Sequence, residues 1–97
     1  MRLNPQQIAA IQTLLRTRLG EDSGIWLFGS RTDDNALGGD IDLYVEPAQL
    51  PESNRFLLRQ KLKRDLEKRL HSAVDLIINE GRTTAFMRLA KREGVRL

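Results

Sequence analysis

The sequence contains no cysteine, and only 5% of its 97 residues are aromatic. Without cysteine the chain can form neither a disulfide framework nor a thiolate metal site. Its apolar runs are far shorter than the ~20 residues that a membrane-spanning helix needs. The first ten residues, MRLNPQQIAA, lack the apolar stretch of a signal peptide. We therefore expect a cytoplasmic protein that does not associate with a membrane.

Charge is distributed unevenly along the chain. The formal net charge is +3, but residues 1–54 contain four Lys or Arg and eight Asp or Glu, whereas residues 55–97 contain twelve and five. One explanation is that the helices of the second part simply have solvated surfaces. The other is an acidic centre in the first part and, in the second, a basic surface that faces an anion or a partner.

The pattern of apolar residues and helix signals predicts a single small domain that covers residues 1–97. The expected helices cover about residues 5–19, 53–70 and 83–93, and the expected strands cover residues 25–28, 40–45, 73–78 and 95–97. This order predicts an α/β (α+β) fold, in which helices pack on a small mixed β-sheet. The residues expected to point into the core are Leu58, Leu62, Leu66 and Leu70 in the long helix, and Phe86, Leu89 and Ala90 in the last helix.

Two aspartates interrupt the second expected strand. Asp40 and Asp42 alternate with Ile41, so their side chains should lie on one face of the sheet, roughly 7 Å apart. Two like charges in this position are unfavourable unless a positive group lies between them. A basic side chain could serve, but Mg²⁺ prefers oxygen ligands and takes one or two carboxylates together with substrate phosphates. The pair therefore favours a metal site over exposed edge carboxylates.

A third carboxylate, Asp75, lies within the apolar run AVDLII. An isolated carboxylate in an apolar strand is unfavourable unless it is paired or bound to a metal. Asp75 could pair with Arg or Lys at a sheet edge. If its strand lies beside the second strand, Asp75 instead joins Asp40 and Asp42, and three carboxylates can hold two cations about 3.5–4 Å apart.

Gly29 and Ser30 follow the first apolar strand. Glycine lets the backbone approach a ligand closely, and free N–H groups at a helix start bind phosphate. A Gly-Ser pair alone is an ordinary turn. The informative feature is the order: an apolar strand, Gly-Ser, nine residues, Asp-Ile-Asp on a strand, and then Asp75.

This order resembles the DNA polymerase beta-like nucleotidyltransferase superfamily, and in particular its minimal branch, the MNT-type nucleotidyltransferases. The resemblance covers nearly the whole chain. It implies that Gly29 and Ser30 hold a nucleoside triphosphate, that Asp40 and Asp42 bind two Mg²⁺ (or Mn²⁺) ions, and that Asp75 completes a metal site and helps to deprotonate the attacking hydroxyl. The implied reaction transfers a nucleoside monophosphate, most simply AMP from ATP, to a hydroxyl.

One position departs from the usual pattern of the family. Where many members carry an Ala-Arg-Gly-like stretch after Gly-Ser, this chain has Arg31, followed by Asp33 and Asp34. Arg31 could contact a phosphate or pair with either acid. The departure concerns nucleotide affinity and leaves the predicted metal ligands Asp40, Asp42 and Asp75 untouched.

Many proteins of this family and size are antitoxins that are paired with a HEPN-domain toxin, and some of them inactivate it by adding AMP. The resemblance thus implies an AMP-transferring antitoxin in a hetero-oligomer with a HEPN toxin. The alternatives are an antitoxin that acts by binding alone and a nucleotidyltransferase that modifies RNA or a small molecule. The long helix offers a basic surface for an acidic partner, or for RNA, formed by Arg55, Arg59, Lys61, Lys63, Arg64, Lys68 and Arg69.

Overall fold

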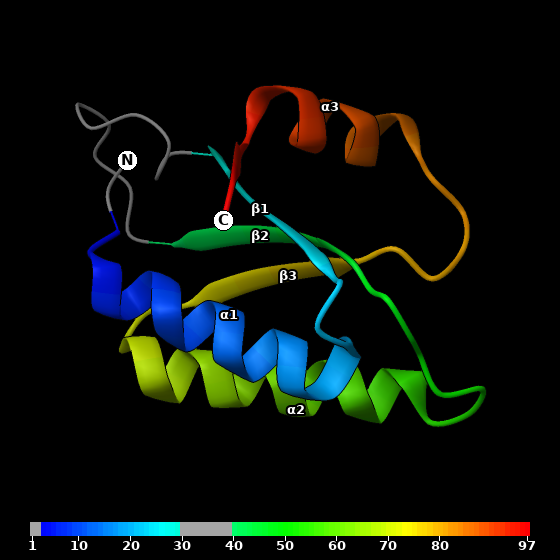
Figure 1. Cartoon of the computed structure of the whole chain (residues 1–97), viewed down its shortest axis with the longest axis horizontal. Helices are drawn as coiled ribbons and strands as arrows, with labels where there is room; N and C mark the ends of the chain where they lie inside the picture. Colours follow the sequence, from blue (N-terminus) through cyan, green and yellow to red (C-terminus); the bar gives the residue numbers. More distant parts are fainter. Residues whose placement is uncertain (1–2, 30–39) are drawn as a thin grey trace.

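The computed structural model of the chain describes residues 3–29 and 40–97, and these residues form a mixed four-stranded sheet between two layers of helix (Figure 1). The elements in chain order are α1 (Pro5–Leu19), β1 (Gly24–Phe28), β2 (Ile41–Glu46), α2 (Arg55–Leu70), β3 (Val74–Ile78), α3 (Ala85–Glu93) and β4 (Val95–Arg96). The predicted fold class is confirmed. The element ends differ from the predicted ones by one or two residues, as is usual where helices and strands fray.

The strands lie in the order β3-β2-β1-β4. β1 pairs antiparallel with both β2 and β4, whereas β2 and β3 are parallel. A parallel pair needs a long crossover, and α2 supplies it here. The consequence for the site is that the strands carrying Asp42 and Asp75 are direct neighbours.

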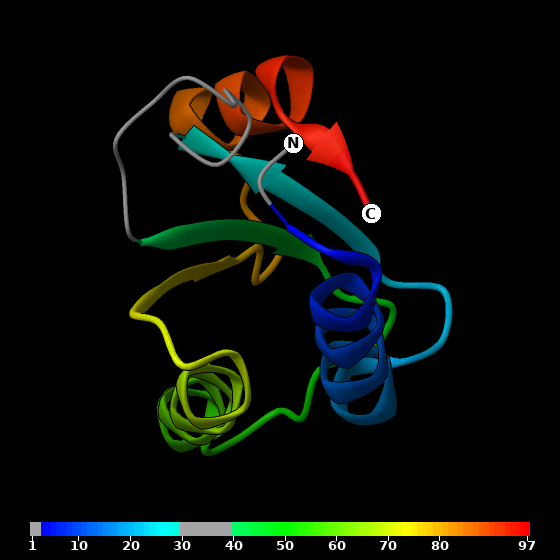
Figure 2. The same cartoon turned by 90° about the vertical axis from the view of Figure 1, so that its left-hand side faces the viewer.

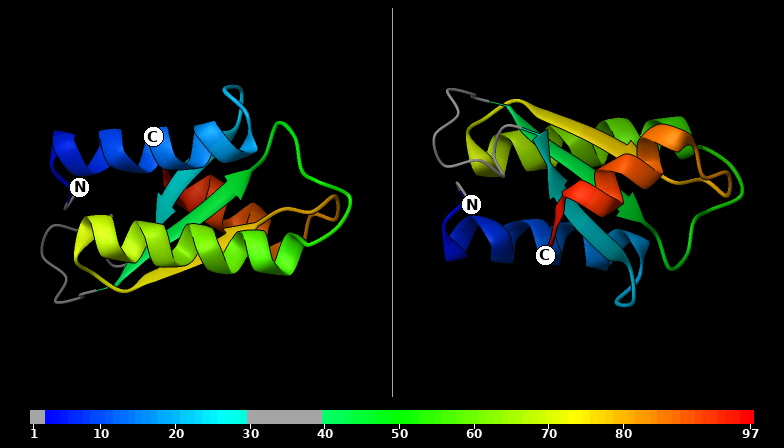
Figure 3. Two further views of the ribbon diagram at one scale, coloured as in Figure 1. Left: turned by 90° about the horizontal axis from the view of Figure 1, so that it is seen from below. Right: turned by 90° about the horizontal axis from the view of Figure 1, so that it is seen from above.

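Helices α1 and α2 lie side by side and antiparallel on one face of the sheet (Figure 3). Asn4 begins α1 through a capping box: its side chain accepts from the backbone of Gln7, whose side chain accepts from the backbone of Asn4. Gly20, with φ +103°, ends the helix. None of the helices in the described ranges combines the length and apolar composition needed to cross a membrane.

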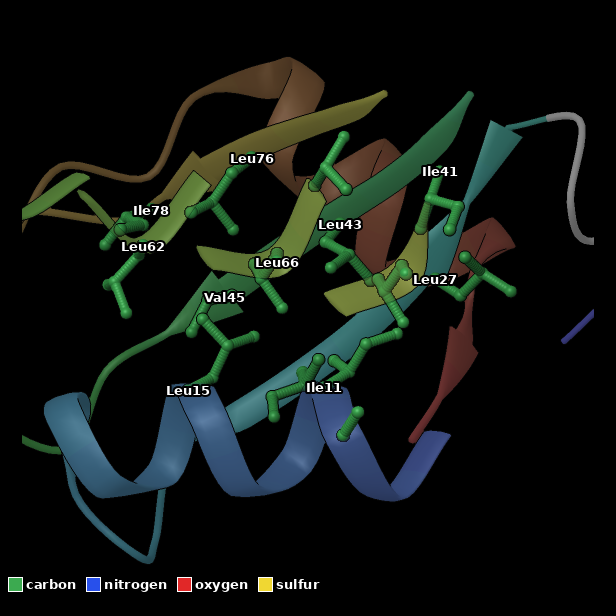
Figure 4. Packing of buried hydrophobic residues seen from close by; sticks show 14 of the residues in the cluster. Ile11, Leu15, Leu27, Ile41, Leu43, Val45, Leu62, Leu66, Leu76 and Ile78 are labelled. Carbon is green, nitrogen blue, oxygen red and sulfur yellow. The ribbon is translucent and has the colours of Figure 1, made fainter. Parts of the chain in front are cut away.

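The main core fills the space between this helix pair and the sheet (Figure 4). Leu62, Leu66 and Leu70 of α2 are buried as predicted, and Leu58 is partly buried. Ile41, Leu43 and Val45 of β2 point into the same core. Because strand residues alternate between faces, the intervening β2 residues point to the opposite face.

Helix α3 covers that opposite face, as a view along the sheet shows (Figure 2). Trp26 of β1 and Tyr44 of β2 are buried against Ala90 of α3, and Met87 packs against them. The expectation that Phe86 and Leu89 also point inward was wrong, because their side chains are 51% and 41% exposed.

The position of Gly94 explains why these two side chains stay outside. A Cβ atom at Gly94 would overlap the carbonyl oxygens of Ala90 and Leu27, so the end of α3 lies directly on β1. At that short distance the small Ala90 faces the sheet. Phe86 and Leu89 then lie on the flank of the helix, beside the end of β1.

Candidate active site

The register of the sheet places Phe28, Asp42 and Asp75 in one row across three strands. Phe28 of β1 is the partner of Asp42 in β2, and Asp42 is the partner of Asp75 in β3. The residues on either side of both aspartates are buried in the main core, so both carboxylates belong to the α3 face of the sheet. The sequence predicted this shared face. The catalytic and metal-binding roles of these residues stay predictions.

Asp42 lies at the centre of the negative charge. Partial burial, then the carboxylate of Asp75 and then that of Asp40 raise the pKa of Asp42 above its ordinary value of 3.8. Two neighbouring carboxylates therefore act on Asp42 in the way expected of a clustered site. Asp40 precedes β2 directly and is exposed.

Gly29 forms the border of this cluster at the end of β1. Its φ is +76°, a left-handed conformation that favours glycine, and a Cβ atom there would overlap the carboxylate of Asp42. The backbone at Gly29 thus lies directly against the central carboxylate. This close approach requires glycine, as the predicted role in nucleotide binding also does.

Asp75 is more exposed than its apolar neighbours suggested. Its strand, β3, is an edge strand of the described sheet, and α3 covers Tyr44 and Ile77 in the next row. Asp75 is therefore open to solvent on the face it shares with Asp42. An exposed carboxylate can be reached by a substrate, whereas one beneath a helix cannot.

The predicted nucleotide-binding residues Ser30 and Arg31 lie outside the described residues, as do Asp33 and Asp34. The geometry of the site is therefore defined by Gly29, Asp40, Asp42 and Asp75.

The oxygen donors suit a hard divalent cation such as Mg²⁺. Across residues 3–29 and 40–97, no group of three or more His, Cys, Asp or Glu side chains is already arranged to hold a metal ion. Burial and the carboxylates of Asp75 and Asp40 raise the pKa of Asp42, so a bound cation would favour its ionised form. The donor chemistry fits Mg²⁺, and the binding of two ions stays a prediction.

Two features of the structure were not found from the sequence. Phe28 lies in the row of the carboxylates, which only the register of β1 and β2 reveals. Glu80, just after β3, lies 3.9 Å from Arg55 and 3.3 Å from Arg59. Part of the basic charge of α2 is therefore offset by an acid that is distant in sequence, and no local pattern signals this pairing.

Neither protein-family models nor curated proteins match this chain. Solved structures do match. A chain of the toxin-antitoxin complex MntA-HepT aligns with a TM-score of 0.71 and 26% identity, covering 96% of this chain and 70% of that one. A chain of a toxin-antitoxin complex with AMP-PNP aligns with a TM-score of 0.74 and 28% identity, covering 97% and 72%.

A third match comes from a complex of a tri-AMPylated Shewanella oneidensis HEPN toxin with an MNT antitoxin. It has a TM-score of 0.70 and 27% identity, covering 94% of this chain and 68% of that one. Another structure of the MntA complex carries two aspartate-to-glutamate substitutions two positions apart, the same spacing as Asp40 and Asp42. The predicted resemblance to MNT-type nucleotidyltransferases is thus confirmed over nearly the whole chain.

Proposed function

We propose that this chain, which resembles MNT-type nucleotidyltransferases in sequence pattern and in fold, transfers AMP from ATP to a hydroxyl of a cognate HEPN toxin and so acts as its antitoxin. The observation that carries the proposal is the register pair Asp42 and Asp75, bordered by Gly29, in a chain that folds like the MNT antitoxins. One of those complexes holds AMP-PNP and another an AMPylated toxin. We place the activity in the cytoplasm, where ATP is available.

The three carboxylates divide the chemistry between them. Asp40, Asp42 and Asp75 would hold Mg²⁺ or Mn²⁺, which when bound neutralises charge on the attacking and leaving oxygens. Asp75, the most accessible member of the register pair, accepts the proton of the attacking hydroxyl. The hydroxyl oxygen then bonds to the α-phosphorus. The bond from that phosphorus to its bridging oxygen breaks, and pyrophosphate leaves with the electron pair.

The end of β1 positions the triphosphate. Gly29 has no side chain, so a phosphate can approach the backbone there closely, beside the carboxylate of Asp42. Ser30 and Arg31 follow directly in the sequence and add a hydroxyl and a guanidinium as donors to the phosphates. These groups act on the substrate together with the metal-binding carboxylates.

The partner contact is proposed for the basic surface of α2, on the face of the sheet opposite the carboxylates. Lys61, Arg64, Lys68 and Arg69 are exposed there. An acidic surface on the toxin would be attracted to this helix, which makes association fast and sensitive to salt. The complex would contain more than one copy of each chain, so that docking and modification can involve different copies of the toxin.

Co-expression with the proposed cognate HEPN toxin tests the function. The wild-type chain should restore growth, and the copurified toxin should carry AMP when its intact mass is measured. Asp42→Asn and Asp75→Asn should fold, bind the toxin and leave it unmodified. Neutralisation by both variants without any AMP on the toxin would show an antitoxin that acts by binding alone. AMP found on RNA instead would show a different acceptor.

A further inference from the structure

A small apolar cavity lies beside the carboxylates, between the end of β1 and the flank of α3. Its volume is about 280 Å³, and it is lined by Phe28, Gly29, Phe86, Leu89, Ala90 and Glu93. The rings of Phe28 and Phe86 meet edge to face, with centroids 5.6 Å apart and planes at 80°. Such a pair is a favourable aromatic geometry, so it forms a defined wall of the cavity.

The two largest side chains on the α3 side of this cavity are only half covered by the described chain. Phe86 is 51% and Leu89 41% exposed, one helical turn apart. Single exposed apolar side chains are common, but two that line a hollow beside a polar site are typical of a binding pocket. Filling the hollow with an apolar ring would remove their exposed surface from water.

The cavity is continuous with the carboxylate site. Phe28 is the register partner of Asp42, and Gly29 lines the cavity while it also lies against the carboxylate of Asp42. One row of the sheet therefore leads from an aromatic wall to a cluster of acids. A ligand that occupies both needs a flat apolar end and an end that binds the carboxylates through a cation.

We infer that this cavity binds the nucleobase of the substrate, with its ring against Phe86 and Leu89 and its phosphates at Gly29. The inference rests on the proposed nucleotidyltransferase function and names the base site of that reaction. Pockets for whole small ligands span about 300–1,000 Å³, so a cavity of 280 Å³ suits one ring system and leaves the phosphates outside.

Among the described residues that line the cavity, Glu93 is the acidic one. An ionised carboxylate only accepts hydrogen bonds, so it pairs with an amino or ring N–H group at the edge of a base. The exocyclic amino group of adenine is such a donor. This arrangement agrees with ATP as the substrate, because its base presents a donor and its phosphates present the charge.

Binding measurements with Mg-ATP and with Mg-tripolyphosphate separate the base from the phosphates. Phe86→Ala should weaken ATP binding at least about fivefold, since stacking of a base on an aromatic ring is worth about 1–3 kcal/mol. The same variant should bind tripolyphosphate as the wild type does. Phe56→Ala is the matched control, because Phe56 is also an early helix residue, in α2, and is 62% exposed.

The outcomes distinguish this inference from the proposed function. Unchanged ATP affinity in Phe86→Ala would overturn the base site. Unchanged ATP affinity with reduced transfer to the toxin would also overturn it, and would assign the cavity to the acceptor. A wild-type chain that binds neither ATP nor tripolyphosphate would overturn the proposed function itself. A loss of ATP binding in Phe86→Ala alone, with tripolyphosphate binding retained, supports both.

Discussion

The surroundings of Asp42 disfavour the ionised form of its carboxyl group. Partial burial and two neighbouring carboxylates raise its pKa. Because the pKa in the folded protein is higher than the unfolded value, the contribution of Asp42 to stability is fully present below the unfolded pKa. It is lost as pH rises through the folded pKa. At neutral pH the ionised Asp42 therefore destabilises the fold when no cation is present.

Asp42→Asn should for this reason raise the free energy of unfolding at pH 7. The gain should not exceed ~1 kcal/mol, because solvent screens a partly exposed carboxylate. The gain should shrink as pH falls and the wild-type Asp42 becomes protonated. Thermal unfolding across pH without divalent cations measures this, with exposed Glu52→Gln as control. Destabilisation by Asp42→Asn at pH 7 would indicate a structural role for the carboxylate.

Alanine substitutions at Gly29 and Gly81 test whether the close contact between Gly29 and Asp42 matters, with Gly81 as the control. Both have positive φ, +76° and +112°, but an added Cβ overlaps Asp42 only at Gly29 and meets nothing within 4 Å at Gly81. Both alanine variants should lose about 1 kcal/mol from backbone strain. Gly29→Ala should lose more and should also weaken nucleotide binding. Equal losses in chemical denaturation, with nucleotide binding intact in both, would remove Gly29 from the site.

At the scale of elements, α3 shows where sequence patterns lose information. The sequence predicted that Phe86, Leu89 and Ala90 all point into the core, but only Ala90 is buried. Ala90 faces the sheet, whereas Phe86 and Leu89 face the cavity at the end of β1. Periodicity gives the spacing of a stripe and not its rotation, which depends on the close contact of Gly94 with β1.

The strands of the sheet were easier to predict from the sequence than the orientation of α3. Alternation placed Asp42 on the face opposite Ile41 and Leu43, and apolar runs located β1 and β3. The register that aligns Asp42 with Phe28 and Asp75 comes from pairing between segments far apart in sequence. Such pairing is fixed by the packed core, so the sequence indicated the shared face but not the row.

The outer surface of α2 gives a prediction for the partner. Arg55 and Arg59 lie near Glu80, while Arg64 and Lys68 are exposed. Arg64→Glu with Lys68→Glu should slow association with the toxin about tenfold or more at low salt, since the change removes electrostatic steering. Surface plasmon resonance at several salt concentrations measures the rate.

The control for this reversal is Arg88→Glu with Arg92→Glu, which makes the same change of charge at exposed positions of α3, across the sheet from α2 (Figure 2). This pair should slow association much less. An equal slowing by both pairs would indicate a general effect of net charge. No slowing by the α2 pair would show that α2 is a solvated surface, the alternative that the composition left open.

At the scale of the whole molecule, the sheet separates two layers with different tasks. The main core joins α1 and α2 to one face, and the other face carries the carboxylates and the cavity.

Leu66→Ala should lower the free energy of unfolding by about 2–5 kcal/mol, because Leu66 is completely buried. Leu57→Ala, at a position 64% exposed, should change it by less than about 0.5 kcal/mol. Similar losses in denaturant titrations would contradict the assigned core.

The central claim is that the row of carboxylates catalyses transfer of AMP to the toxin, and transfer of label from ATP tests it most directly. With ATP labelled at the α-phosphate, the toxin should become labelled by the wild-type chain with Mg²⁺. It should stay unlabelled with Asp42→Asn or with Asp75→Asn. With ATP labelled at the γ-phosphate, label should appear in pyrophosphate only. Label on the toxin from the γ-phosphate, or equal α-labelling by wild type and both variants, would contradict the account.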